Sequence, residues 1–176
     1  MEIVVLILEF LSTRKGYRYW ISLVISVIVG VLTFYCSNLP SDLITTAGDS
    51  ILNVIGILLG FTISILAIII SGDNKNINGA KEYKIGKQLF SDKQLSLYDR
   101  IIIDLCYTIL LQSVILLLLL TLPYFIEDAC RHLQFISIMI GMSIHVILMI
   151  ISISLDLYLI VYKKYHFNLY FLIFAR

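Results

Sequence analysis

Four long segments of this chain contain no acidic or basic side chains, and the charged residues lie outside them; the segments are 19–36, 50–72, 105–126 and 133–155. A helix needs about 20 consecutive apolar residues to cross the hydrocarbon of a bilayer. No segment alternates apolar and polar residues as the strands of a membrane β-barrel do. The pattern therefore predicts an all-α, polytopic membrane protein, a single domain of residues 1–176 with four transmembrane helices at about 19–36, 50–72, 101–126 and 133–162.

Composition agrees with this interpretation. Hydrophobic residues make up 60% of the 176 residues and charged residues 14%, whereas ordinary soluble domains have roughly 45–50% and 25%. The formal net charge of +1 provides no strong field to attract nucleic acid. We therefore expect no direct nucleic-acid binding, and we exclude a disordered chain and a conventional soluble enzyme.

Lysine and arginine are distributed unevenly among the segments outside the four predicted spans. Twelve of the 13 precede the first span, lie between the second and third, or follow the fourth, and only Arg131 lies in the other two connections. Cytoplasmic segments of membrane proteins carry an excess of these residues. The asymmetry predicts that both termini and the loop 73–100 are cytoplasmic.

Apolar residues near both termini predict short helices lying at the inner membrane interface. The segment 3–11 is too short to cross a bilayer, and Glu2 and Glu9 do not fit a signal peptide. At the other end, aromatic residues recur at three- and four-residue spacing, which is typical of an interfacial helix; they are Phe167, Tyr170, Phe171 and Phe174. The alternative there is a loosely ordered apolar tail.

The loop 73–100 is the largest polar segment. Its first part, 74–79, is rich in Asn and predicts an irregular loop. Ser91 and Gln94 have the spacing of a capping box, so we expect the third long helix to begin near residue 92. The loop also mixes lysines with apolar residues, as a protein-docking surface does, although these apolar residues could alternatively lie on the inner leaflet. The candidate docking residues are Lys81, Lys84, Lys87, Leu89 and Phe90.

Small or weakly polar residues repeat along one face of the second span. They are Asn53, Gly56, Gly60, Ser64 and Ala67, at spacings of three and four. Small residues let membrane helices approach closely. The face is a candidate for helix packing or oligomerisation, and three uses stay open: packing within the chain's own bundle, packing between subunits, and lining a pore.

Polar residues also recur within the third and fourth spans. Asp104, Thr108 and Gln112 lie four apart, and Ser137, Gly141 and His145 repeat that spacing before Asp156. Ionisable residues inside a membrane face the bundle interior or water. The candidate intramembrane polar residues are Asp104, Gln112, His145 and Asp156. They form either a seam that senses protons, ions or lipid, or a structural set in which a neutral His145 bonds to Gln112 or to a backbone carbonyl.

The sequence contains no catalytic or cofactor-binding motif of a familiar kind. The three histidines are separated by the predicted topology, and the three cysteines lack the spacing of metal ligands. We expect no catalytic residue, no cofactor and no metal site.

In its size, its four predicted spans, its orientation and its 56–72 segment, GILLGFTISILAIIISG, the chain resembles the KwaA family, the membrane subunits of the Kiwa anti-phage defence system. The resemblance implies a multi-pass protein of the bacterial inner membrane, in contact with membrane lipid. It also implies a homo-oligomer, for which we expect a tetramer, that senses infection or anchors a soluble cytosolic partner similar to KwaB. An oligomeric ion channel or membrane-permeabilising effector is the alternative function, and a small transporter is a third.

Overall fold

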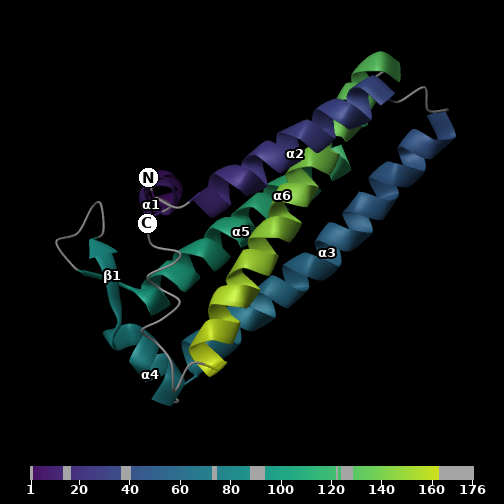
Figure 1. Cartoon of the computed structure of the whole chain (residues 1–176). Coiled ribbons are helices and arrows are strands. Elements are labelled where there is room, and N and C mark those ends of the chain that lie inside the picture. Colours follow the sequence, from purple (N-terminus) through teal and green to yellow (C-terminus); the bar gives the residue numbers. More distant parts are fainter. Residues whose placement is uncertain are drawn as a thin grey trace.

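The computed structural model describes residues 2–13, 17–36, 41–72, 75–87, 94–121, 123 and 129–162. Within them the chain is almost entirely helical, which confirms the predicted helical architecture (Figure 1). Its elements are α1 (Glu2–Thr13), α2 (Tyr17–Cys36), α3 (Ser41–Ser71), α4 (Lys75–Glu82), β1 (Lys84–Lys87), β2 (Gln94–Ser96), α5 (Leu97–Thr121) and α6 (Ala129–Tyr162).

Three helices are long and apolar enough to cross a membrane, over Thr46–Ser71, Leu97–Thr121 and His132–Tyr158. They correspond to the second, third and fourth predicted spans. The first predicted span corresponds to a shorter apolar helix, Trp20–Tyr35, within α2.

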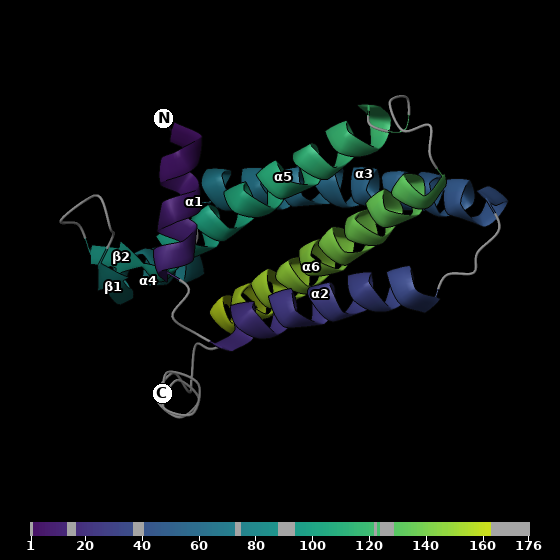
Figure 2. The same cartoon turned by 90° about the horizontal axis from the view of Figure 1, so that it is seen from above.

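The four long helices run side by side as an elongated bundle (Figures 1 and 2), in which α6 packs against α2, α3 and α5. An apolar cluster that includes Ile55, Ile115 and Met139 fills the space between α3, α5 and α6. Six of the eight residues that α5 buries follow alternating spacings of four and three, as at the core positions of a coiled coil; they are Ile101, Leu105, Thr108, Gln112, Ile115 and Leu119. Two polar side chains, Thr108 and Gln112, therefore occupy core positions.

A small layer of α1, α4 and the two strands lies at one end of the bundle. Helix α1 crosses α5 near the end where α5 begins (Figure 2). Its Phe10 is fully buried and stacks on the Tyr107 ring, with ring centroids 3.7 Å apart. Ile3 and Val4 are exposed, so α1 buries one apolar side and leaves another uncovered, as an interfacial helix does. The predicted C-terminal helix lies outside the described residues.

Two expectations for the loop 73–100 are wrong. Its Asn-rich part forms α4 rather than an irregular loop, because α4 packs against α5 and α6 and buries Ala80. Gln94 pairs with Lys87 in the antiparallel ladder of β1 and β2, so it cannot close a capping box with Ser91.

Helix α5 instead begins at Leu97, behind a cap formed by Ser96 and Asp99. The Asp99 amide donates to Ser96 Oγ at 3.1 Å, and the Ser96 amide donates to Asp99 Oδ2 at 3.0 Å. This is the reciprocal arrangement of a capping box, with Asp in the position usually taken by Glu or Gln. The β-hairpin displaces the start of the helix by about one turn from the predicted position, because the residues before Leu97 are paired as a strand.

Candidate functional site

Helices α2 and α6 approach each other closely, and two glycines permit it. A Cβ atom added at Gly141 would lie 2.9 Å from the carbonyl oxygen of Ser26. A Cβ atom added at Gly30 would lie 3.2 Å from the carbonyl oxygen of Ser137. Both contacts are to backbone, which cannot rotate away, so larger residues at these positions would force the helices apart. This is the small-residue packing that membrane helices use.

One hydrogen bond joins the same two helices a turn further along. Ser22 Oγ lies 2.7 Å from His145 Nδ1, and both side chains are buried. Of the two bonds considered for a structural His145, the one to Gln112 does not form, because neither amide atom of Gln112 has a hydrogen-bond partner among the described residues. Sequence reasoning missed Ser22. A signal was available, since Ser22, Ser26 and Gly30 have the same four-residue spacing as Ser137, Gly141 and His145.

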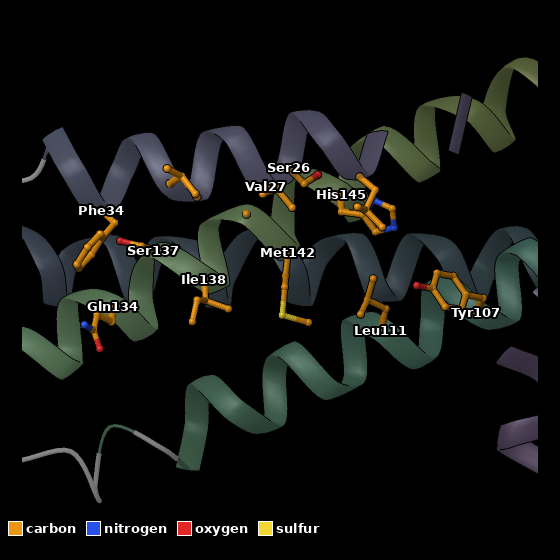
Figure 3. A pocket seen from close by; sticks show the side chains of 14 residues that line it. Ser26, Val27, Phe34, Tyr107, Leu111, Gln134, Ser137, Ile138, Met142 and His145 are labelled. Atoms are coloured by element: carbon orange, nitrogen blue, oxygen red, sulfur yellow. The ribbon is translucent and has the colours of Figure 1, made fainter. Parts of the chain in front are cut away.

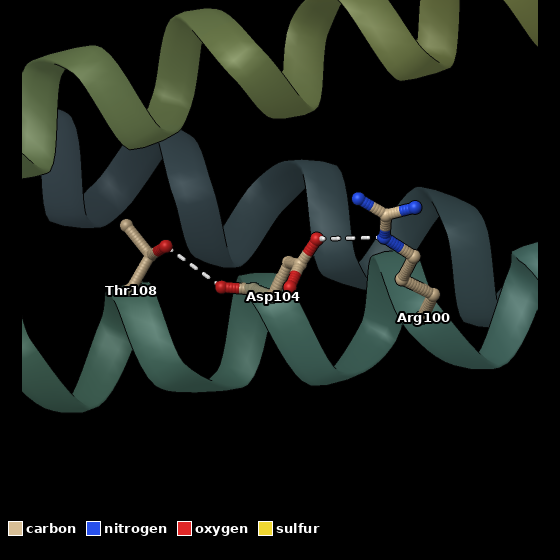
Figure 4. Close-up of polar contacts among 3 residues, drawn as sticks. All are labelled: Arg100, Asp104 and Thr108. Carbon is tan, nitrogen blue, oxygen red and sulfur yellow. Dashed lines mark hydrogen bonds and ion pairs between the residues drawn. The ribbon is translucent and has the colours of Figure 1, made fainter. Parts of the chain in front are cut away.

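Three polar residues of α5 lie in the interior of the bundle. Asp104, Thr108 and Gln112 are each 0% exposed. Arg100 Nε lies 4.0 Å from Asp104 Oδ2, and Thr108 Oγ1 donates to the Asp104 backbone carbonyl at 2.7 Å (Figure 4). A buried carboxylate needs such a cation nearby, because burial penalises an isolated charge.

The structure places the predicted intramembrane polar residues in different surroundings. Gln112 shares the α5 face that packs with Ile115 and Leu119, whereas His145 bonds to α2. Asp156 lies near the carboxyl-terminal end of α6 and is partly exposed.

The small-residue face of α3 is uncovered. Asn53, Gly56, Gly60, Ser64 and Ala67 are all exposed. A Cβ atom added at Gly56 or Gly60 would meet nothing described within 4 Å. Packing of this face within the chain's own bundle, one of the three uses considered, is therefore wrong. Helix α3 turns a different face toward the bundle, on which Ile55, Thr62 and Ile69 are buried at seven-residue spacing.

Of the candidate docking residues, Lys81, Lys84 and Lys87 belong to the layer at the end of the bundle. Lys81 and Lys84 are exposed. Lys81 Nζ lies 4.9 Å from the centre of the Tyr98 ring, and Lys84 Nζ donates to the Lys81 carbonyl at 3.3 Å. Lys87 ends β1, and its side chain lies outside the described part, as do Leu89 and Phe90.

Among the described residues, no group of three or more His, Cys, Asp or Glu side chains could hold a metal ion. The chain matches no model of a protein family, no curated protein and no solved structure.

Proposed function

We propose that this chain is a four-span protein of the bacterial inner membrane whose cytoplasmic end docks a soluble protein. One observation carries the proposal: α1, α4 and the β-hairpin gather at a single end of the bundle (Figures 1 and 2). This end carries the exposed Lys81 and Lys84. The positive-inside rule assigns that end to the cytoplasm.

In this proposal α2 crosses the membrane as well, in addition to α3, α5 and α6. It has 20 residues, which at 1.5 Å per residue give about 30 Å, the thickness of the hydrocarbon core. Val24, Val27 and Ile28 leave about half of their surface exposed, as expected for a helix in contact with lipid. Four crossings return the chain to the side on which it starts, so both termini are cytoplasmic.

The exposed small-residue face of α3 is the proposed contact between copies of the chain. Asn53 is exposed on this face, beside Gly56 and Gly60, where a helix backbone can approach closely. In hydrocarbon, a hydrogen bond from the carboxamide of Asn53 to a neighbouring helix would stabilise the association of the two helices. We propose a homo-oligomer, a tetramer by preference, held by this face.

Together these features fit the role of the Kiwa membrane subunit: a membrane sensor or anchor that recruits a soluble partner similar to KwaB. The exposed lysines would steer an acidic partner surface and set the rate of encounter. The competing function is an oligomeric channel, which the buried Asp104 and Gln112 favour because interior polar groups can mark an ion path.

The test replaces Lys81, Lys84 and Lys87 with Glu in the full chain. Purification in mild detergent, with mass analysis of the bound proteins, should recover a stoichiometric soluble partner with the original chain and lose it with the triple variant. The same triple replacement with Gln separates loss of positive charge from gain of negative charge. Membrane insertion is checked for each variant, since the lysines also contribute to orientation.

The channel alternative predicts different results in the same set of variants. The Lys variants would then retain function, whereas His145→Leu or Asp156→Asn would abolish ion flux through liposomes that contain the purified chain. Flux that depends on His145, together with full function of the triple Glu variant, would refute the docking proposal.

A further inference from the structure

Helices α2, α5 and α6 border a groove of about 610 Å³ (Figure 3). Its volume lies within the range of about 300–1,000 Å³ that small-molecule sites occupy. Most of its lining is apolar and includes Leu23, Val27, Val31, Leu111, Ile138 and Met142. The groove is separate from the α3 face and from the lysines of the docking surface.

The groove is long, and it follows the helix axes. Its lining runs from Leu23 to Phe34 on α2 and from Gln134 to His145 on α6. Eleven helical steps correspond to about 16 Å. Gly30 and Gly141 belong to the lining and carry no side chain to fill it. Val27 and Ile138 are 57% and 58% exposed, so the groove is open along a side of the bundle.

A buried polar group in the lining has no hydrogen-bond partner in the part of the chain that the structure describes. Ser137 is 3% exposed, and its Oγ has no hydrogen-bond partner among the described residues. In Figure 3 its hydroxyl is turned toward Phe34, at the end of the groove that also holds Gln134. A buried hydroxyl without a partner is destabilising, so an acceptor brought in by a ligand would be stabilising.

We propose that this groove binds one acyl chain of a membrane glycerolipid, with an ester carbonyl of the lipid accepting a hydrogen bond from Ser137. The hydrocarbon chain then extends along Val27 and Met142 toward His145. Ser137 lies five residues inside the apolar helix that starts at His132, or about 8 Å. That depth places it below the headgroups, where the ester groups of a lipid give way to hydrocarbon.

The chemistry of the lining favours an acyl chain over a second copy of this protein. The lining is mostly apolar along its length, and the buried Ser137 hydroxyl lies near one end of it. An open-sided, apolar groove along the helix axes with a hydroxyl near one end matches a hydrocarbon chain that ends in an ester. Without an occupant its lining would lose dispersion contacts.

The inner end of the groove reaches the cytoplasmic layer. Tyr107 lines the groove and stacks on Phe10 of α1. A lipid chain in the groove therefore contacts the residue that holds α1 against the bundle. In the proposed sensor, Tyr107 would thus link a lipid in the groove to α1 at the docking end.

The test uses the full chain in nanodiscs of phosphatidylethanolamine, of which a small share carries a diazirine in one acyl chain. After illumination, mass mapping should find adducts concentrated on half-buried lining residues such as Met142 and Leu111. Exposed apolar residues outside the groove, such as Ile57 and Ile68 of α3, should react less. Labelling in proportion to exposure would overturn the proposal without any substitution being needed.

Two matched double variants test whether the adducts on Met142 depend on access to the groove. Val27→Trp with Ile138→Trp fills the groove from both sides and should reduce the adducts on Met142 at least fivefold. Ile28→Trp with Ile147→Trp adds the same bulk at exposed positions outside the lining and should leave them unchanged. Equal labelling of Met142 in both variants, or a change in oligomer size with unchanged labelling, would overturn the proposal.

This inference rests on the proposed insertion in a membrane but not on the docking of a partner. Incorporation into nanodiscs tests insertion separately. A chain that incorporates but shows no groove adducts refutes the lipid site and leaves the proposed function standing.

Discussion

The contact between α2 and α6 makes a quantitative prediction for Gly141→Ala. The added Cβ atom would lie 2.9 Å from the Ser26 carbonyl oxygen, whereas ordinary contacts begin near 3.4 Å. The difference of 0.5 Å must be taken up by moving two helix backbones. Overpacking of this kind costs about 1–3 kcal/mol, while Ala in place of Gly gains about 1 kcal/mol in helix propensity. The net change should be a loss of up to about 2 kcal/mol in the free energy of unfolding.

Gly60→Ala provides the matched control. The substitution is the same, it also lies in a long apolar helix, and nothing described lies within 4 Å of the added atom. Because Gly60 lies on the proposed contact between copies, both variants are compared as monomers. Within a monomer only the gain in propensity remains, so the unfolding free energy should be unchanged or rise by up to about 1 kcal/mol. Unfolding of both variants by sodium dodecyl sulfate in mixed micelles, followed by circular dichroism, measures the difference.

The hydrogen bond between Ser22 and His145 should also be affected when the Gly141→Ala substitution moves α2 away from α6. It lies one turn from Gly141 and measures 2.7 Å, so separating the helices should weaken it. His145→Leu should therefore cost less stability in the Gly141→Ala background than in the original chain, because neighbouring substitutions are not additive. Equal stabilities of the Gly141→Ala and Gly60→Ala variants, with additive effects of His145→Leu, would refute the close α2–α6 contact.

Three further predictions follow from other parts of the fold. Gly60→Leu should reduce the size of the oligomer in native mass spectrometry, because the face of α3 on which it lies is the proposed contact between copies, whereas Phe61→Leu on a neighbouring face should not; equal behaviour would argue against this interface. Gln112→Leu should raise the unfolding free energy by about 1–3 kcal/mol, because it removes a buried amide without a hydrogen-bond partner among the described residues; a loss of similar size would show that the amide is bonded in the membrane. Ser96→Ala should lower the unfolding free energy by about 1 kcal/mol by removing the cap of α5, and hydrogen exchange should show faster exchange in its first turn; unchanged exchange there would contradict the cap.

The long helices could be predicted from the sequence because each is specified by the composition and length of one continuous segment. An apolar segment of sufficient length specifies a membrane helix whatever its neighbours are. The start of α5 could not be placed, because two Ser residues, Ser91 and Ser96, both precede acceptable capping partners. The choice between them depends on the pairing of β1 with β2, a contact between separate segments.

The faces of the helices were harder to predict than the helices themselves. The small-residue pattern of α3 is the longest in the chain, yet that face is exposed, and the shorter pattern of α2 makes the close contact with α6. Spacing shows which residues share a face but not which helix, if any, lies against it. In the same way, spacing places Gln112 and His145 within predicted spans, but it does not reveal that His145 bonds to α2.

The most direct test of the central proposal maps the topology of the chain in a bacterial membrane. Reporters fused after residue 80, within α4, and after residue 176 should be active only as cytoplasmic reporters. A reporter placed in the connection between α5 and α6, at residue 127, should be active only as a periplasmic one. This result would place the docking layer and the C-terminus in the cytoplasm and the connection between α5 and α6 on the other side of the membrane. Periplasmic activity at residue 80 or residue 176 would contradict it.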